Sequence, residues 1–161
     1  MTITLPATFS DILVVCSGNL CRSPMAAAAL RNELAAAGIR GAMVHSAGTI
    51  AKPGAPATPE AIEAAETCGL DISYHRATPL TRELVRRADL ILVMEKSHLD
   101  TVRNLDQGAA EKTFMIGDWT DEAVRGADIP DPYGMPFNFY QIVLHRLCVA
   151  ARRLADQIRG V

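Results

Sequence analysis

The sequence lacks an apolar run long enough to span a bilayer, and it lacks a strong excess of charge of either sign. The first absence argues against insertion of a helix into a membrane. A formal net charge of −2 gives no overall basic field that would attract nucleic acid. The four cysteines are too few and too scattered for a disulfide scaffold.

The remaining composition is that of an ordinary globular domain, with 49% hydrophobic and 21% charged residues. A chain of 161 residues can bury one full hydrophobic core, so we predict a single domain over residues 1–161. Residues 1–11 show no basic start followed by an apolar core. We therefore expect no secretion signal.

Short apolar runs alternate with helical patterns along the chain. We predict strands at 12–16, 42–46, 89–94 and 113–116, and helices at 24–37, 59–69, 81–88, 96–106 and 137–158. Stretches rich in Gly and Pro predict loops at 47–59 and 118–136. Such alternation implies right-handed crossovers. The predicted fold class is α/β, a three-layer sandwich whose four-stranded parallel sheet has the flavodoxin-like order 2-1-3-4.

The segment after the first predicted strand is suited to binding an anion. Its residues are Cys16, Ser17, Gly18, Asn19, Leu20, Cys21, Arg22, Ser23 and Pro24. Small and polar residues let several backbone N–H groups surround one anion, and the N-terminus of the next helix adds a positive dipole end. We expect Ser23 to be the N-cap of that helix and Pro24 to occupy its first position.

Cys16 and Arg22 supply the chemistry of this segment. The positive surroundings favour the thiolate form of Cys16, which is the nucleophilic form. Arg22 offers a planar fork to two phosphate oxygens. Ligands of open parallel sheets bind beyond the carboxyl ends of the strands, where this segment lies. The pattern predicts attack by a thiolate on a bound phosphate, in a reducing compartment such as the cytoplasm.

The nine-residue run from Cys16 to Pro24 resembles the active-site loop of the low-molecular-weight protein tyrosine phosphatases. The resemblance covers nearly the whole chain, and residues 89–96 are similar to the bacterial branch. It implies a protein-tyrosine-phosphatase that forms a phosphocysteine at Cys16 and needs no metal or organic cofactor. The phosphate- and substrate-binding residues that it implies are Ser17, Gly18, Asn19, Leu20, Cys21, Arg22, Ser23 and Tyr133.

Hydrolysis of a phosphate monoester also needs a proton for the leaving oxygen. Asp131 lies in Ile-Pro-Asp-Pro-Tyr, which resembles the general-acid loop of the family. A proline on each side restricts the backbone around this carboxylate. A structural turn aspartate is the alternative reading of Asp131, and Asp128 is the alternative acid.

The resemblance also implies a supporting polar network in which Ser46 and His75 bond around Asn19 and Ser23. Without the family, His75 would be read as an ordinary surface or core histidine. Cys21 occupies a position that pairs with the nucleophile under oxidation in many family members; a small buried thiol is the alternative.

For the remaining cysteines and histidines we predict structural roles. We expect Cys68 and Cys148 to lie in the core. The other three histidines, at positions 45, 98 and 145, are too scattered to indicate a metal site. Trp119 is read as loop packing.

Three other functions fit parts of the pattern. Thiol-coupled arsenate reductases need further cysteines, and residues 78–94 contain none. Protein arginine phosphatases tend to have threonine where this chain has Leu20, and an apolar side chain suits an aromatic ring better. A non-catalytic phosphotyrosine-binding module would have lost Cys16, Arg22 or Asp131, and all three are present.

The sequence departs from the eukaryotic pattern at the expected pocket wall. Gly134 follows Tyr133 where those proteins often carry a second aromatic residue, and no tryptophan lies near Ile50. These differences make the wall thinner. The expected partner is a phosphotyrosine protein, and a tyrosine kinase of the polysaccharide-export type fits the bacterial resemblance.

Overall fold

The computed structural model describes residues 3–7 and 9–160, and within them four parallel strands form one sheet in the order β2-β1-β3-β4. The strands are β1 (Asp11–Cys16), β2 (Met43–Gly48), β3 (Leu90–Val93) and β4 (Thr113–Met115). The predicted α/β class and the strand order 2-1-3-4 are confirmed.

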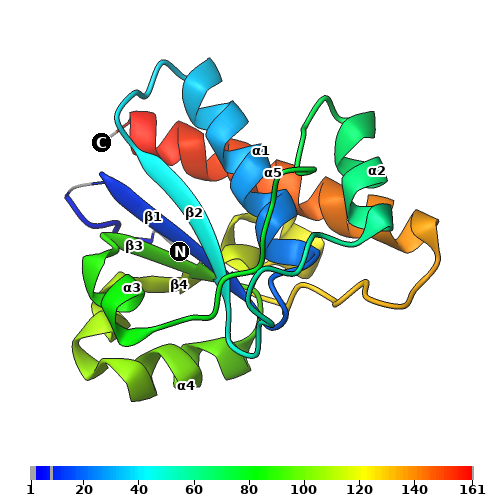
Figure 1. Ribbon diagram of the computed structural model, residues 1–161. Helices are drawn as coiled ribbons and strands as arrows, with labels where there is room; N and C mark the ends of the chain where they lie inside the picture. Colours follow the sequence, from blue (N-terminus) through cyan, green and yellow to red (C-terminus); the bar gives the residue numbers. More distant parts are fainter. Residues whose placement is uncertain (1–2, 8, 161) are drawn as a thin grey trace.

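Helices α1 and α5 cover one face of the sheet, and α3 and α4 cover the other (Figure 1). The helices are α1 (Arg22–Ala36), α2 (Pro59–Thr67), α3 (Arg82–Arg87), α4 (Lys96–Leu105) and α5 (Phe137–Arg159). Short 3-10 turns are η1 (Gln107–Lys112), η2 (Ile116–Trp119) and η3 (Glu122–Val124). Within the described ranges, no helix combines the length and the apolar character that a membrane crossing requires.

The central strand β1 is apolar throughout because both of its faces are covered. Ile12 and Val14 face the cluster formed with α1 and α5, whereas Leu13 and Val15 face the cluster formed with α3 and α4. All four side chains are 0% exposed. A strand held this tightly on both sides fixes the position of the loop that follows Cys16.

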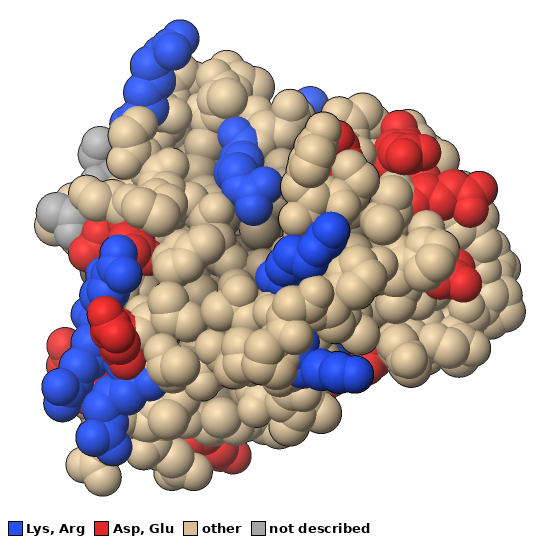
Figure 2. All heavy atoms as spheres, in the orientation of Figure 1, with Lys and Arg blue, Asp and Glu red and all other residues tan. Residues whose placement is uncertain are grey.

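On the face shown in Figure 2, acidic side chains gather over α2 and basic side chains gather over α3. Glu60, Glu63 and Glu66 are exposed on α2, and Arg82, Arg86 and Arg87 are exposed on α3. The acidic patch on α2 contains no basic side chain, whereas the exposed Glu83 lies among the basic side chains of α3.

Three local expectations are wrong. Helix α1 begins at Arg22 with Cys21 as its N-cap residue, so Pro24 lies at the third helical position rather than the first, and no side chain caps the helix. The Ser23 hydroxyl instead bonds to Cys16 and Asn19, so it is part of the loop network rather than a helix cap. Cys68 is exposed at the C-terminal end of α2, where the chain turns through Gly69 (φ 73°), and it does not lie in the core.

Two other side chains show how α5 packs. Cys148 is half-buried beside the main core cluster. Trp119 is buried and donates its indole N–H to Gln157 of α5 at 2.8 Å. The reading of Trp119 as loop packing agrees with this contact.

Gly48, at the end of β2, lies against the loop that follows β1. A Cβ atom there would come within 2.5 Å of the Ser17 carbonyl oxygen and 2.9 Å of the Asn19 Cβ. Both neighbours are held close to the backbone and cannot move aside as a flexible side chain would. The space between β2 and this loop therefore admits only glycine.

We expect Gly48→Ala to lower the free energy of unfolding by about 1–3 kcal/mol, because the added methyl group overpacks a rigid contact. Gly108→Ala is the matched control, since its Cβ would meet only the Asp106 carboxylate at 3.4 Å. Urea unfolding of both variants measures the difference. Equal stabilities would show that the loop yields to the methyl group.

Candidate active site

The loop between β1 and α1 forms the floor of a cavity of about 210 Å³. Its walls come from the segments after β2 and before α5. The lining residues are Cys16, Ser17, Gly18, Leu20, Cys21, Arg22, Ile50, Asp131 and Tyr133. The structure thus brings the predicted nucleophile, the predicted acid and most of the predicted binding residues into one cavity.

Cys16 lines the base of this cavity, and 2% of the residue is exposed. Its Sγ accepts the Asn19 backbone N–H at 3.2 Å and lies 2.9 Å from the Ser23 Oγ. The Ser23 Oγ in turn accepts from the Asn19 Nδ2 at 2.7 Å. Its own proton is therefore available to the sulfur, so two donors point at the nucleophilic atom.

Asn19 holds the loop in shape. Its φ of 58° is left-handed, a conformation that Asn tolerates better than most residues. Its Oδ1 accepts the Thr78 N–H at 2.9 Å, which fixes the orientation of the amide. The Nδ2 then donates to Ser46 at 2.9 Å, and His75 Nε2 donates to the Asn19 carbonyl at 2.6 Å. These contacts are the polar network expected around Ser46 and His75.

The contact between His75 and the Asn19 carbonyl depends on the protonation state of the imidazole. The Asn19 carbonyl can only accept, so the proton of a neutral His75 lies on Nε2. Burial lowers the pKa of His75, although the bond to Asn19 opposes that shift. A neutral His75 thus suffices to hold the loop.

Arg22 is the largest fully buried side chain of the site, with 1% of it exposed. One terminal nitrogen, Nη1, donates to Glu95 Oε1 at 2.6 Å and to the Ile129 carbonyl at 2.8 Å. The other, Nη2, lies 3.4 Å from Ser17 Oγ and 3.7 Å from Asp131 Oδ2. These partners fix the plane of the guanidinium at the edge of the cavity.

Asp131 lines the cavity with a half-exposed carboxylate. Its Oδ1 accepts the Tyr133 N–H at 3.1 Å, which shapes the turn before α5. The Ile129 N–H donates to the Met94 carbonyl at 2.8 Å, so the segment before Asp131 is anchored to the end of β3. The predicted acid therefore reaches the cavity from a loop that the sheet positions.

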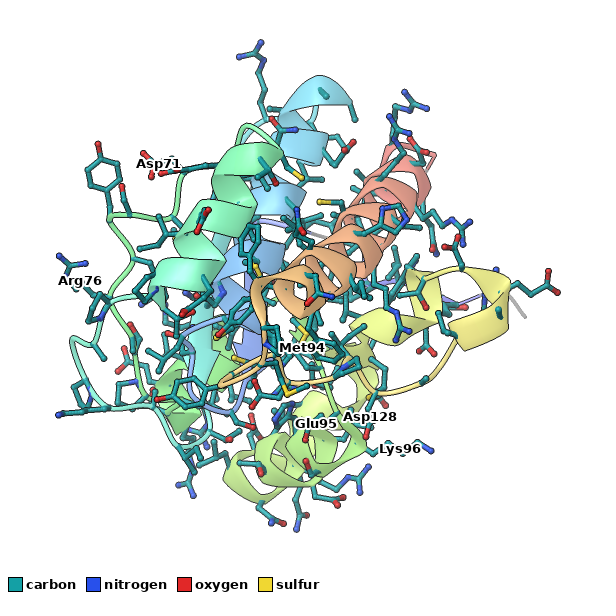
Figure 3. All side chains as sticks on the ribbon, turned by 90° about the vertical axis from the view of Figure 1, so that its right-hand side faces the viewer. Asp71, Arg76, Met94, Glu95, Lys96 and Asp128 are labelled. Atoms are coloured by element: carbon teal, nitrogen blue, oxygen red, sulfur yellow. The ribbon has the colours of Figure 1, made fainter. Side chains whose placement is uncertain are left out.

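Asp128, the alternative acid, has a different environment. Its Oδ1 accepts the Lys96 N–H at 3.0 Å, at the positive N-terminus of α4. Figure 3 shows Asp128 beside Glu95 and Lys96 at the start of that helix. Asp128 is exposed and is not among the residues that line the cavity, so its position suits an anchor for the loop.

Cys21 is buried, and its sulfur contacts the start of α2 and the first turns of α5. Its Sγ lies 3.4 Å from Thr58 Oγ1 and donates to the Tyr140 hydroxyl at 3.6 Å. Burial raises the pKa of the Cys21 thiol, against the effect of these two bonds. The side chain thus behaves as a buried thiol here, and a Cys16–Cys21 disulfide stays a prediction.

Two residues of the site were missed by sequence reasoning. Glu95 lies two residues after the end of β3 and pairs with Arg22. His98 is 2% exposed, and its Nε2 lies 2.9 Å from Ser17 Oγ. Their sequence signal was the position of Glu95 at the carboxyl end of the strand next to β1, with His98 three residues later. No side-chain pattern showed that Arg22 would need an acidic partner there.

Among residues 3–7 and 9–160, no cluster of three or more His, Cys, Asp or Glu side chains has an arrangement that could hold a metal ion. The charge at the site comes from Arg22, Glu95 and Asp131. The arrangement provides a nucleophilic sulfur, a fixed cation beside it and a carboxylate across the cavity.

Comparison with known proteins agrees with this arrangement. A family model described as low molecular weight phosphotyrosine protein phosphatase matches residues 11–160. A probable low molecular weight protein-tyrosine-phosphatase, EpsP of Ralstonia nicotianae, is 41% identical over 93% of this chain and 97% of its own length. A protein-arginine-phosphatase of Bacillus subtilis is 35% identical over 92% of this chain and 97% of its own length.

Solved structures are similar as well. The tyrosine phosphatase Wzb from Escherichia coli K30, in complex with sulphate, superimposes with a TM-score of 0.84 at 38% identity. The match covers 94% of this chain and 99% of that one. The likeness thus includes all elements that carry the cavity.

The Arg22–Glu95 pair predicts a pH dependence of stability. Burial raises the pKa of Glu95, but the hydrogen bond and charge of Arg22 outweigh it and bring the pKa below its usual value. The stabilisation is therefore complete above the unfolded-state pKa of ~4.3 and is lost as the pH falls through the lower folded-state pKa.

We expect Glu95→Gln to be less stable than the wild type by about 1–2 kcal/mol at neutral pH, because a charge-assisted bond becomes a neutral one. The difference shrinks as the pH falls below ~4.3. Urea unfolding over this pH range measures it, with Glu66→Gln on the exposed side of α2 as the control. A pH-independent difference would contradict the assignment.

Proposed function

This chain belongs to the low molecular weight phosphotyrosine protein phosphatase family, and we propose that Cys16, Arg22 and Asp131 carry its phosphatase chemistry. The observation that supports these roles is their position in one cavity, with the thiol at the base and the carboxylate at the wall. Relatives named protein-tyrosine-phosphatases are enzymes, and so is this chain.

In the first step the Cys16 thiolate attacks phosphorus in line with the ester oxygen. A sulfur–phosphorus bond forms, the phosphorus–oxygen bond breaks, and the protonated Asp131 carboxyl gives its proton to the departing phenolate. The Ser23 hydroxyl donates to the sulfur and keeps the thiolate in place before attack. Its proton is free for this bond because the Asn19 amide donates to the Ser23 oxygen.

In the second step a water molecule gives a proton to the Asp131 carboxylate and attacks the phosphocysteine. The sulfur leaves as a thiolate, and inorganic phosphate is released. Arg22 and the backbone N–H groups from Ser17 to Ser23 face the equatorial oxygens in both steps. Donors fixed before the reaction need no reorganisation when the charge moves onto these oxygens.

The apolar part of the cavity favours an aromatic ring. Leu20, Ile50 and Tyr133 all line it, and Ile50 and Tyr133 are 79% and 64% exposed at its mouth. A phosphotyrosine side chain is long enough to bring its phosphate to the loop while its ring lies between these residues. A phosphoserine would reach less deeply.

Hydrolysis of phosphoarginine is the second candidate, because one relative is named a protein-arginine-phosphatase. A guanidinium needs polar partners at the cavity wall, and Leu20 offers none. We therefore favour phosphotyrosine proteins as the substrates. The partner that fits this substrate class is a tyrosine kinase of the same cell, and a reducing cytoplasm suits the four free thiols.

Turnover of matched peptides carrying phosphotyrosine, phosphoserine or phosphoarginine tests the substrate class. We expect phosphotyrosine to have the highest kcat/KM, since only it fills the apolar wall. Cys16→Ser is the control for the nucleophile: it should show no turnover and still bind inorganic phosphate through Arg22 and the loop N–H groups. Preference for phosphoarginine, or turnover by Cys16→Ser, would overturn the proposal.

The role of Asp131 is tested by Asp131→Asn, which removes the proton donor and keeps the shape of the side chain. We expect kcat to fall by roughly 10²–10⁴-fold for a phenyl phosphate. The loss should be much smaller for an ester whose leaving group needs no proton. Asp128→Asn is the matched variant, because its amide oxygen can still accept the Lys96 N–H; a larger leaving-group effect there would make Asp128 the acid.

A further inference from the structure

His98 occupies the third position of α4 and is buried directly beneath the phosphate-binding loop. Its two ring nitrogens contact different elements. Nδ1 accepts the backbone N–H of Glu95 at 3.1 Å, and Nε2 lies 2.9 Å from the Ser17 hydroxyl. The ring therefore links the start of α4 to the residue that follows the nucleophile.

The backbone contact determines where the ring proton is. An amide N–H can only donate, so Nδ1 must be the unprotonated nitrogen. Burial lowers the pKa of His98, and Arg22 adds to this, although Glu95, Asp128 and Asp131 act in the opposite direction. The neutral ring then carries its single proton on Nε2 and donates it to Ser17 Oγ.

The Ser17 oxygen accordingly faces two donors. It accepts from His98 Nε2 at 2.9 Å and from Arg22 Nη2 at 3.4 Å. With both lone pairs directed at donors, its own O–H points elsewhere. In the described part of the chain no protein acceptor lies within hydrogen-bond distance of this proton, and Ser17 lines the cavity.

We propose that His98 is a positioning residue that holds the Ser17 hydroxyl as a hydrogen-bond donor to a phosphate oxygen in the cavity. The inference deepens the proposed function and rests on it. The Ser17 hydroxyl thereby adds a side-chain donor to the backbone N–H groups of the loop. A donor fixed in advance stabilises the charge on the transferring phosphoryl group without reorganisation.

Ser23, on the other side of the nucleophile, follows the same logic. There the Asn19 amide donates to the serine oxygen, which leaves the hydroxyl proton for the Cys16 sulfur. At Ser17 the His98 imidazole is the donor to the serine oxygen, as the Asn19 amide is at Ser23. One serine is thus directed at the sulfur and the other at the phosphate.

A simpler role for His98 would be to cap α4. Glu or Gln at this position of a helix commonly accepts the N-cap backbone N–H, as Nδ1 does here. His98→Asn keeps an acceptor close to the position of Nδ1 for the Glu95 N–H, but its side chain is too short to donate to Ser17 Oγ from there. Ser17→Ala removes the hydroxyl itself, and Ser17→Thr is the conservative variant that retains it.

We expect Ser17→Ala and His98→Asn each to lower kcat/KM for a phosphotyrosine peptide on the order of 10- to 100-fold, the share of one hydrogen bond to a charged group. The double variant should lose no more than either single variant, because both remove the same donor. Ser17→Thr should recover most of the loss. Calorimetry with inorganic phosphate should show weaker binding by about tenfold in both single variants.

Nitrogen-15 NMR of the wild-type histidines gives a readout that needs neither turnover nor a variant. The inference requires a protonated Nε2 and an unprotonated Nδ1 at His98. A proton on Nδ1, full activity in Ser17→Ala, or losses that add in the double variant would each overturn it. Absence of any phosphotyrosine turnover by the wild type would instead defeat the proposed function, and phosphate binding and NMR would still test the role of His98.

Discussion

The buried charge of Arg22 is the constraint on which the arrangement of the site depends. A guanidinium stays protonated, and burying it without partners costs far more than one hydrogen bond returns. Three separate segments supply those partners: Glu95 after β3, the Ile129 carbonyl before the acid loop, and Ser17 in the loop itself. Because the charge cannot be neutralised, these segments must converge whenever the protein is folded.

A second constraint ties β2 to the same loop. The left-handed backbone of Asn19 would be unstable alone, and the contacts from Thr78, Ser46 and His75 hold it. The glycine at position 48 lets β2 come close enough for Ser46 to take part. No buried side-chain nitrogen or oxygen in the described residues lacks a partner, so the network rigidifies the loop without leaving an unpaired polar group.

Much of this could be predicted from the sequence. Apolar runs alternating with helical patterns were enough for the sheet order, because right-handed crossovers leave few alternatives. The loop from Cys16 to Pro24 could be recognised because its residues are adjacent in the sequence, whereas the acid segment around Asp131 was predicted from its resemblance to the family. The Ser23 prediction failed since a serine before a proline has the same local pattern whether it caps a helix or faces a thiol; only the fold decides.

Glu95 and His98 could not be found in this way, because their importance comes from contacts across the sheet. Each is an ordinary helix-start residue locally, and Glu95 becomes the partner of Arg22 only because β3 lies beside β1. The same adjacency places the His98 ring under Ser17. In a parallel sheet, the strand next to the one that carries the nucleophile is therefore the place to search for residues that orient it. Its first helical turn delivers side chains and backbone N–H groups to the same edge of the sheet, whatever their distance along the chain.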